Sequence, residues 1–266
     1  MHVVVCIKSV PETTEVQFDP ITGTMLREGV GAIINPFDMY AIEEGLRLTA
    51  THGGTVTVLS MGPPQAEREL REALAMGCHQ AILLSGRGFA GSDTWATAYA
   101  LSLAIDALAP VDLVLCGKQA IDGDTGQVGP GIANQLGVPQ LTYVWRIREL
   151  DPDAQQIIVE RLLEEGTEVV SARLPAVATV LKGINTPRYP TRRGLRRARA
   201  TEIPVWTPED LPGADLGLMG LDGSPTQVVR VFTPPRRSDR ARLFEGDSPQ
   251  EVVEALVEQL LREKVV

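Results

Sequence analysis

The sequence is poor in the side chains that most often perform catalysis or hold a metal. It has 3 cysteines and 3 histidines among 266 residues. Cys6, Cys78 and Cys116 lie far apart in apolar surroundings and match no metal-ligand spacing, so we expect reduced structural thiols. The histidines have no carboxylate or cysteine pattern around them. These shortages argue against a metal site, a disulfide framework and a catalytic histidine.

Long apolar runs and positive charge are also scarce. No apolar run approaches the ~20 residues that a membrane-spanning helix needs, and no basic segment leads into an apolar one as in a signal peptide. The net charge of -9 argues against a nucleic-acid surface. We therefore expect a cytoplasmic protein without direct membrane insertion, and its 44% hydrophobic content is enough for a buried core.

Strand and helix patterns alternate along residues 1–185, which is typical of βαβ units around a parallel sheet. Short apolar runs predict buried strands, and glycines end the helices between them. The pattern predicts the α/β class, with a three-layer, doubly wound and mostly parallel sheet. The expected strands are Val3–Ile7, Val56–Ser60, Ala81–Ser85, Val111–Cys116, Val138–Val144 and Ala176–Leu181. The expected helices are Pro36–Thr51, Gln65–Met76, Asp93–Leu108 and Ile132–Leu136.

Two hairpins interrupt this alternation. Glu15–Phe18 and Met25–Glu28 flank an Asp-Pro-Ile-Thr-Gly turn and predict a small hairpin insertion after the first strand. A second hairpin is expected from Ile157–Leu163 and Glu168–Arg173, because Glu-Glu-Gly-Thr separates them.

The chain changes character after the predicted α/β nucleotide-binding domain, residues 1–185. We expect residues 186–266 to form an extended C-terminal arm. From Ile203 to Arg237 it has many prolines and glycines with little periodicity, so this stretch is either disordered or lies on another chain. Scattered apolar residues favour contact with another chain. The arm is expected to end in an amphipathic helix, Pro249–Lys264.

The most informative segment is Val111–Gly131, with the sequence V-D-L-V-L-C-G-K-Q-A-I-D-G-D-T-G-Q-V-G-P-G. A buried strand, a glycine-rich turn and a helix start follow one another, which points main-chain N–H groups at a phosphate. The turn matches neither the P-loop nor the usual dinucleotide pattern. An ordinary strand-to-helix loop with a capping aspartate is the alternative.

Within this turn the polar residues suit different tasks. Asp122 and Asp124 would repel a bare phosphate, and they suit ribose hydroxyls, a helix cap or orientation of the loop. The N–H groups of Thr125–Gly129, with the hydroxyl and amide side chains in that stretch, are better phosphate ligands.

Four other segments are expected at the same edge of the sheet, because ligands of open parallel sheets lie beyond the carboxyl ends of the strands. They are Cys6–Lys8, Asn35–Asp38, Met61–Pro64 and Gly86–Thr94, which ends in the stretch Gly91–Thr94. The last three also have a plain structural explanation, namely an N-capped helix, a strand exit and a capped helix. No nucleophile–base pair or carboxylate dyad emerges, so any chemistry would belong to a bound cofactor.

Arginines crowd the segment Arg188–Arg199. Such a cluster is most often a solvated face, but in an acidic protein it also suits a carboxylate-rich partner. Two apolar residues are candidate anchors for that partner, Ile184 shortly before the cluster and Tyr189 next to Arg188.

Together these segments resemble the beta subunit of electron-transfer flavoprotein over essentially the whole chain. The motifs that carry the resemblance stand in order and at suitable spacing. They are Val4–Lys8, Asn35–Asp38 with Ala41–Glu44, Ala73–Gly77, Gly117–Asp122, Leu174–Val177 and Pro187–Tyr189. The resemblance implies a fold like that of the adenine nucleotide alpha-hydrolases and a heterodimer with an alpha subunit. It also implies electron transfer between NADH or dehydrogenases and flavoprotein or quinone acceptors, with an acyl-CoA-type dehydrogenase or a quinone oxidoreductase as partner.

The family has two forms, which differ in the ligand of the beta subunit. In one form beta holds AMP as a structural ligand, and in the electron-bifurcating form it holds a second FAD that NADH reduces. Asp38, the turn Asp122–Pro130 and the segment Gly223–Gln227 resemble the second form, so FAD is expected and AMP is the alternative. Such a chain would oxidise NADH only together with alpha. A non-bifurcating carrier and a regulatory protein similar to universal stress proteins are the other hypotheses.

The resemblance also assigns roles to individual residues. Adenine and ribose are expected to meet Cys6, Asn35, Pro36, Phe37, Asp38 and Met61. Phosphates are expected to meet Ala120, Ile121, Asp122, Gly123, Asp124, Thr125, Gly126, Gln127, Val128, Gly129, Pro130 and Gly131. The flavin ring is expected toward Gly91, Asp93 and Thr94. Ile184, with Tyr189 nearby, corresponds to the family's anchor for docking dehydrogenases, and the arm from Ile203 onward is expected to wrap the alpha subunit.

Overall fold

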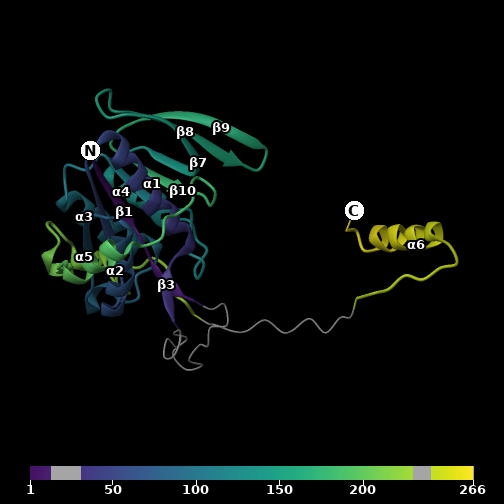
Figure 1. The fold of residues 1–266 in the computed structure, drawn as a ribbon. Helices are drawn as coiled ribbons and strands as arrows, with labels where there is room; N and C mark the ends of the chain where they lie inside the picture. The colour runs from purple at the N-terminus through teal and green to yellow at the C-terminus, as the bar shows by residue number, and fades with distance from the viewer. Residues whose placement is uncertain (13–30, 230–240, 266) are drawn as a thin grey trace. The chain divides into compact units, whose positions relative to one another are not determined.

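The computed structural model describes residues 1–12, 31–229 and 241–265 (Figure 1). Contacts divide the chain into two compact units, Met1–Val229 and Arg230–Val266. The strands are β1 (His2–Cys6), β2 (Ser9–Pro11), β3 (Ala32–Ile34), β4 (Thr55–Met61), β5 (Gln80–Leu84), β6 (Leu113–Gly117), β7 (Gln140–Asp151), β8 (Gln156–Leu163), β9 (Gly166–Arg173), β10 (Ala176–Val180) and β11 (Val205–Trp206). The α-helices are α1 (Pro36–His52), α2 (Glu67–Met76), α3 (Thr94–Ala107), α4 (Val128–Leu136), α5 (Arg192–Ala200) and α6 (Pro249–Arg262).

A nine-stranded sheet organises the first unit. Its strand order is β11-β5-β4-β1-β6-β10-β7-β8-β9. Neighbours pair in parallel from β11 to β7, and β7, β8 and β9 pair antiparallel. The chain moves from β1 outward to β4 and β5, then returns to β6 on the other side of β1, so strand order reverses between β1 and β6. The doubly wound, mostly parallel sheet predicted from the sequence is confirmed.

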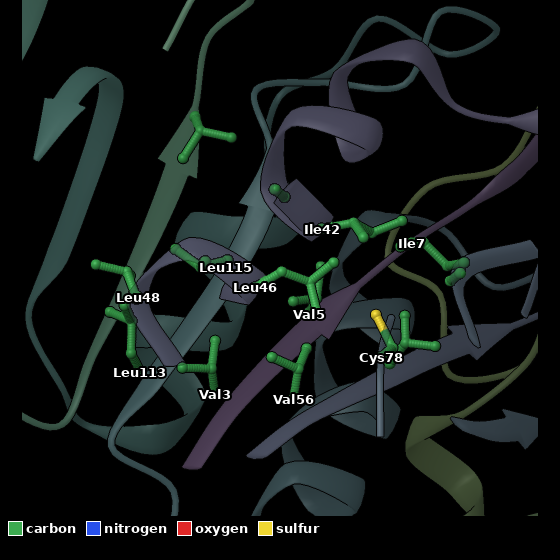
Figure 2. Close-up of a cluster of buried hydrophobic side chains, with 14 of the residues drawn as sticks. Val3, Val5, Ile7, Ile42, Leu46, Leu48, Val56, Cys78, Leu113 and Leu115 are labelled. Carbon is green, nitrogen blue, oxygen red and sulfur yellow. The ribbon is translucent and has the colours of Figure 1, made fainter. Parts of the chain in front are cut away.

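Apolar clusters cover both faces of this sheet. Successive β1 side chains point to opposite faces, so Val3 and Val5 join one cluster and Val4 and Cys6 join the other. Residues of α1, α2 and α5 complete the first cluster, and residues of α3 and α4 complete the second. Figure 2 shows part of the first cluster, where Ile42 of α1 lies with the β1 side chains. The three-layer arrangement is therefore confirmed.

The helix ends follow local sequence signals, with one shift that affects the candidate site. Pro36 opens α1 and Gly77 ends α2, as expected. Helix α4 begins at Val128, one turn before the expected Ile132, because Pro130 falls in the first turn, where a missing N–H removes no helical bond. None of the helices in the described ranges is long and apolar enough to cross a membrane.

The two expected hairpins are described to different extents. Strands β2 and β3 pair antiparallel on either side of residues 13–30, with Ser9 opposite Ile34. The hairpin strands expected within that gap, Glu15–Phe18 and Met25–Glu28, lie outside the described residues. The second hairpin is confirmed as β8 and β9, with Leu163 opposite Gly166 at the turn.

The first part of the expected C-terminal arm belongs to the first unit. The division at Val229 differs from the boundary expected after residue 185. Ile203, Leu211 and Met219 are buried in the two clusters, and β11 extends the sheet beside β5. The helix expected at Pro249–Lys264 is found as α6, which ends two residues earlier at Arg262. No α6 side chain is buried. Contact of the arm with another chain stays a prediction.

Two arginines of the basic segment hold helices together within the first unit. Arg197 of α5 donates to the main-chain oxygens of Leu74 at 2.7 Å and Cys78 at 2.9 Å, which satisfies carbonyls at the end of α2. Arg188 forms a two-pronged ion pair with Glu43 of α1, at 2.7 and 2.9 Å. Both side chains are therefore used inside the fold, although the sequence offered a solvated face or a partner patch.

Candidate functional site

The edge where β1 and β6 end is the position at which open α/β sheets bind ligands. The loops that follow these strands run in opposite directions, because strand order reverses between them. Cys6 of β1 lies in register with Cys116 of β6. The loop after β1 therefore starts beside the glycine-rich turn that begins at Gly117.

Asn35 ties the start of α1 to this turn. Its side-chain Nδ2 donates to the main-chain oxygen of Gln119 at 2.9 Å, and its Oδ1 accepts from the N–H of Ile121 at 3.2 Å. Asn35 occupies the N-cap position, as expected, but its side chain makes no capping bond to α1. The side chain thus orients the turn, while the helix start relies on Pro36.

Asp38 is a buried carboxyl at the centre of the same edge. It accepts from the N–H of Lys8 at 2.8 Å, from Asn35 Nδ2 at 3.0 Å and from the N–H of Gly117 at 3.1 Å. Burial raises the pKa of Asp38 from 3.8 to about 7, and the bonds from Asn35, Lys8 and Gly117 oppose that rise. Asp38 therefore joins the ends of β1 and β6 through their main chains.

The two aspartates of the glycine-rich turn are engaged by neighbouring side chains. Lys8 Nζ lies 2.7 Å from Asp122 Oδ1, which links the loop after β1 to the turn after β6. Gln119 Nε2 donates to Asp124 Oδ1 at 2.6 Å. Asp124 has a φ of 51° and its N–H donates to the oxygen of Ala120 at 2.9 Å. Of the roles considered for these carboxylates, orientation of the loop is the one these contacts support.

The main chain that follows presents a row of hydrogen-bond donors. Within residues 1–12, 31–229 and 241–265, none of the N–H groups of Thr125–Gly129 donates a hydrogen bond to a protein acceptor. The last two of these groups open α4, where the helix dipole adds partial positive charge. A row of unpaired N–H groups at a helix start suits a phosphate or diphosphate.

Gly129 lies in close contact with the sheet. A Cβ atom at this position would collide with the Thr179 methyl group of β10. The absence of a side chain therefore lets the first turn of α4 approach the carboxyl edge of the sheet. Gly131, one position after Pro130, is similarly close to Ala98 of α3, because a Cβ there would lie 2.8 Å from the Ala98 methyl.

The start of α3 reaches the same row of donors. Asp93 caps α3, because its Oδ1 accepts from the N–H groups of Trp95 at 2.9 Å and Ala96 at 3.0 Å. Thr94 Oγ1 donates to Gln127 Oε1 at 2.9 Å, which joins α3 to the residue before α4. Gly91 precedes this cap with a φ of +79°. The structure thus brings the Gly91–Thr94 segment to the glycine-rich turn, as expected.

The remaining residues expected around adenine lie along the strand ends. Cys6 is buried, and its hydrogen bond with Cys116, together with burial, raises the pKa of the Cys116 thiol. Phe37 lies against Gly117 in the first turn of α1. Met61 ends β4 and packs on the second apolar cluster. In the described part of the chain, no hydrogen bond connects the Met61 side chain to the Asn35–Asp38 group.

Ile184 and Tyr189, the candidate partner anchors, have different environments. Ile184 is half-buried against the first apolar cluster, whereas Tyr189 exposes 90% of its surface. The loop that carries them is held to α1, since Asn185 Nδ2 donates to the oxygen of Tyr40 at 2.9 Å. Of the two, Tyr189 is the side chain that projects into solvent.

Some contacts at the site involve residues that the sequence placed near the ligand edge or in a family motif but to which it gave no role of their own. Lys8 and Gln119 hold the two aspartates of the turn. A lysine directly after one strand and an acidic turn after another could have indicated the first of these pairs. Thr226 contacts the Asp93 carboxylate from more than a hundred residues away, and no local signal identifies such a contact.

Comparisons with known proteins agree with this architecture. A model of the electron transfer flavoprotein domain matches residues 22–211. The chain is 49% identical over 268 residues to the electron transfer flavoprotein subunit beta of Thermoanaerobacterium thermosaccharolyticum, with 100% of each chain covered. It is 48% identical over 265 residues to Protein FixA of Azotobacter vinelandii, covering 98% of this chain and 94% of that protein. It is 46% identical over 274 residues to the subunit beta of Megasphaera elsdenii, again with 100% of each covered. The chain therefore belongs to the electron transfer flavoprotein family, as one of its beta subunits.

Proposed function

We propose that this beta subunit holds an adenine nucleotide at the edge between β1 and β6, and that the nucleotide is FAD. The observation that carries the proposal is the row of unpaired N–H groups at Thr125–Gly129, placed at the start of α4 and at the reversal of strand order. A phosphate there would accept bonds that the described protein does not supply. AMP would use the same donors, so it is the alternative ligand.

The arrangement of side chains fits binding and orientation of a cofactor. The Asn35–Asp38 group and the Lys8–Asp122 pair fix the turn, and Thr94 with Gln127 fixes its far end. A bound flavin would supply the one-electron and two-electron chemistry. The chain's own residues would hold the diphosphate, shield the adenine side and set the charge around the cofactor.

Membership in the family suggests the partners with which this subunit would act. We infer a cytoplasmic heterodimer with an alpha subunit, in which electrons pass from NADH or a dehydrogenase to flavoprotein or quinone acceptors by flavin-based bifurcation. An acyl-CoA-type dehydrogenase or a quinone oxidoreductase is the expected partner, with Ile184 and Tyr189 at the contact. The support is the family membership and the position of the donor row at the edge between β1 and β6.

The ligand released from the purified alpha–beta complex tests the cofactor. We expect mass spectrometry and absorbance to find two FAD molecules and no AMP per heterodimer. One flavin and one AMP would contradict bifurcation through this subunit and support the plain carrier. A beta chain that is stable alone and binds ATP tightly would instead favour a regulatory protein similar to universal stress proteins.

Removal of the second unit tests the partner. A chain ending at Val229 should keep its thermal midpoint and its nucleotide but lose the alpha subunit, because α6 exposes an apolar stripe that includes Leu256 and Leu261. Co-purification with tagged alpha measures the loss. Leu256→Asp in the full chain should act in the same direction, with Glu258→Gln on the same helix as control. Equal recovery of alpha by all chains would contradict the prediction.

A further inference from the structure

The last segment of the first unit is bonded to the start of α3. The hydroxyl of Ser224 accepts from the N–H of Asp93 at 2.8 Å, and the N–H of Gly220 donates to the Ser92 hydroxyl at 3.0 Å. Met219, directly before this segment, is 2% exposed in the second apolar cluster. The segment is therefore also held by apolar packing. We refer to Gly220–Thr226 as the clamp segment.

Thr226 completes the contact through the Asp93 carboxylate. The Thr226 N–H donates to Asp93 Oδ2 at 2.9 Å and its hydroxyl donates to the same oxygen at 2.8 Å. The other oxygen, Oδ1, caps α3. Both carboxylate oxygens are therefore engaged within the chain. Burial opposes ionisation of Asp93, but the bonds from Ala96 and Thr226 outweigh it and lower its pKa, so the carboxylate is ionised at neutral pH.

This contact continues to the donor row of the candidate site. Thr94, the residue after Asp93, bonds Gln127, and Gln127 directly precedes α4. The connection from Thr226 to Asp93, and from Thr94 to Gln127, thus leads from the end of the first unit to the N–H groups expected to bind phosphate. Displacement of the Asp93–Thr94 turn would lengthen or break the bond between Thr94 and the Gln127 side chain.

We propose that Ser224 and Thr226 are positioning residues for the nucleotide, which hold the Gly91–Thr94 turn and, through Thr94 and Gln127, the first turn of α4. The inference rests on the proposed function. It assigns the Asp93 carboxylate to helix capping and to the clamp segment, and leaves Thr94 and the main chain of the turn to face the ligand.

Isosteric variants in the full chain with its alpha subunit test the role. Thr226→Val removes the hydroxyl donor but keeps the main-chain N–H, and Thr226→Ser restores the hydroxyl. We expect the Kd for FAD and for AMP, titrated separately into ligand-depleted complex, to rise about tenfold in Thr226→Val, because the Thr94–Gln127 end of the connection would be held less firmly. Thr226→Ser should bind like the wild type. Ser224→Ala, which removes the hydroxyl that accepts from the N–H of Asp93, should weaken binding in the same direction.

Two controls test whether the change in Kd belongs to this connection. Thr51→Val changes a threonine whose hydroxyl bonds only within α1, to Arg47, and should leave Kd unchanged. A double-mutant cycle of Thr226→Val with Thr94→Val should give a combined effect smaller than the product of the separate effects, because both act on one connection.

The outcomes distinguish the inference from the function on which it rests. Weakened binding in Thr226→Val at an unchanged thermal midpoint, with rescue by serine, supports the positioning role. A wild type that binds nucleotide and variants with the same Kd would overturn this inference alone. A wild type that binds neither FAD nor AMP would overturn the proposed function and this inference together.

Discussion

Gly117→Ala is expected to destabilise the first unit by about 3 kcal/mol and to abolish nucleotide retention. A Cβ atom at residue 117 would overlap Asp38 Oδ1 and would lie 2.7 Å from the main-chain carbonyl carbon of Phe37. Neither atom can move freely, because Asp38 is held by three hydrogen-bond donors and Phe37 lies in the first turn of α1. The extra carbon would therefore push β6 away from α1 at the edge where the ligand is expected.

Gly123→Ala, in the same turn, is the matched control. A Cβ atom at residue 123 has no neighbour within 4 Å, so its stability should change by less than about 0.5 kcal/mol. Urea unfolding of both variants beside the wild type measures the difference in stability, and the nucleotide content of purified Gly117→Ala, compared with the wild type, measures retention. Equal stability of Gly117→Ala and Gly123→Ala would show that the packing between Gly117 and Asp38 is looser than described.

Asp38→Asn is expected to flatten the dependence of stability on pH. The folded state binds the Asp38 proton more tightly than the unfolded chain, because burial raises its pKa from 3.8 to about 7. Protonation therefore stabilises the fold, and this contribution declines as pH rises from about 4 through about 7. Between pH 5 and pH 8 the wild type should lose about 2 kcal/mol that the asparagine variant does not lose.

Urea unfolding at several pH values from 5 to 8 measures this difference. Asp222→Asn changes an exposed aspartate in the clamp segment and should keep the wild-type slope. Parallel stability curves for wild type and Asp38→Asn would contradict a raised pKa. They would mean that the bonds from Lys8, Asn35 and Gly117 stabilise the carboxylate enough to offset its burial.

Much of the central fold could be predicted because its signals are local. Buried parallel strands are short apolar runs, and β1, β4, β5, β6 and β10 each match a predicted run to within a few residues. Helix ends were also predictable where a proline or glycine marks them, as at Pro36 and Gly77. The early start of α4 was missed because its glycines indicated a turn, although a helix tolerates Pro130 in its first turn.

Prediction from local sequence signals failed for the first part of the C-terminal arm. Residues after Ile203 have few periodic signals, yet Leu211 and Met219 are buried and β11 adds a strand to the sheet. Leu211 and Met219 are buried in the second apolar cluster, which residues of several strands and of α3 and α4 form only after the sheet has assembled. Hydrophobic periodicity in the sequence therefore does not predict which residues of this segment are buried.

The sequence by itself determined the class of the fold, the strands of its parallel core and the family, because these depend on local periodicity and on motifs in a fixed order. The tertiary structure alone decided which side chains meet: Asn35 with the turn after β6, Lys8 with Asp122, and Thr226 with Asp93. The physical reason is that such bonds join residues far apart in the chain. Their partners are set by strand order and helix packing, and no short stretch of sequence records either.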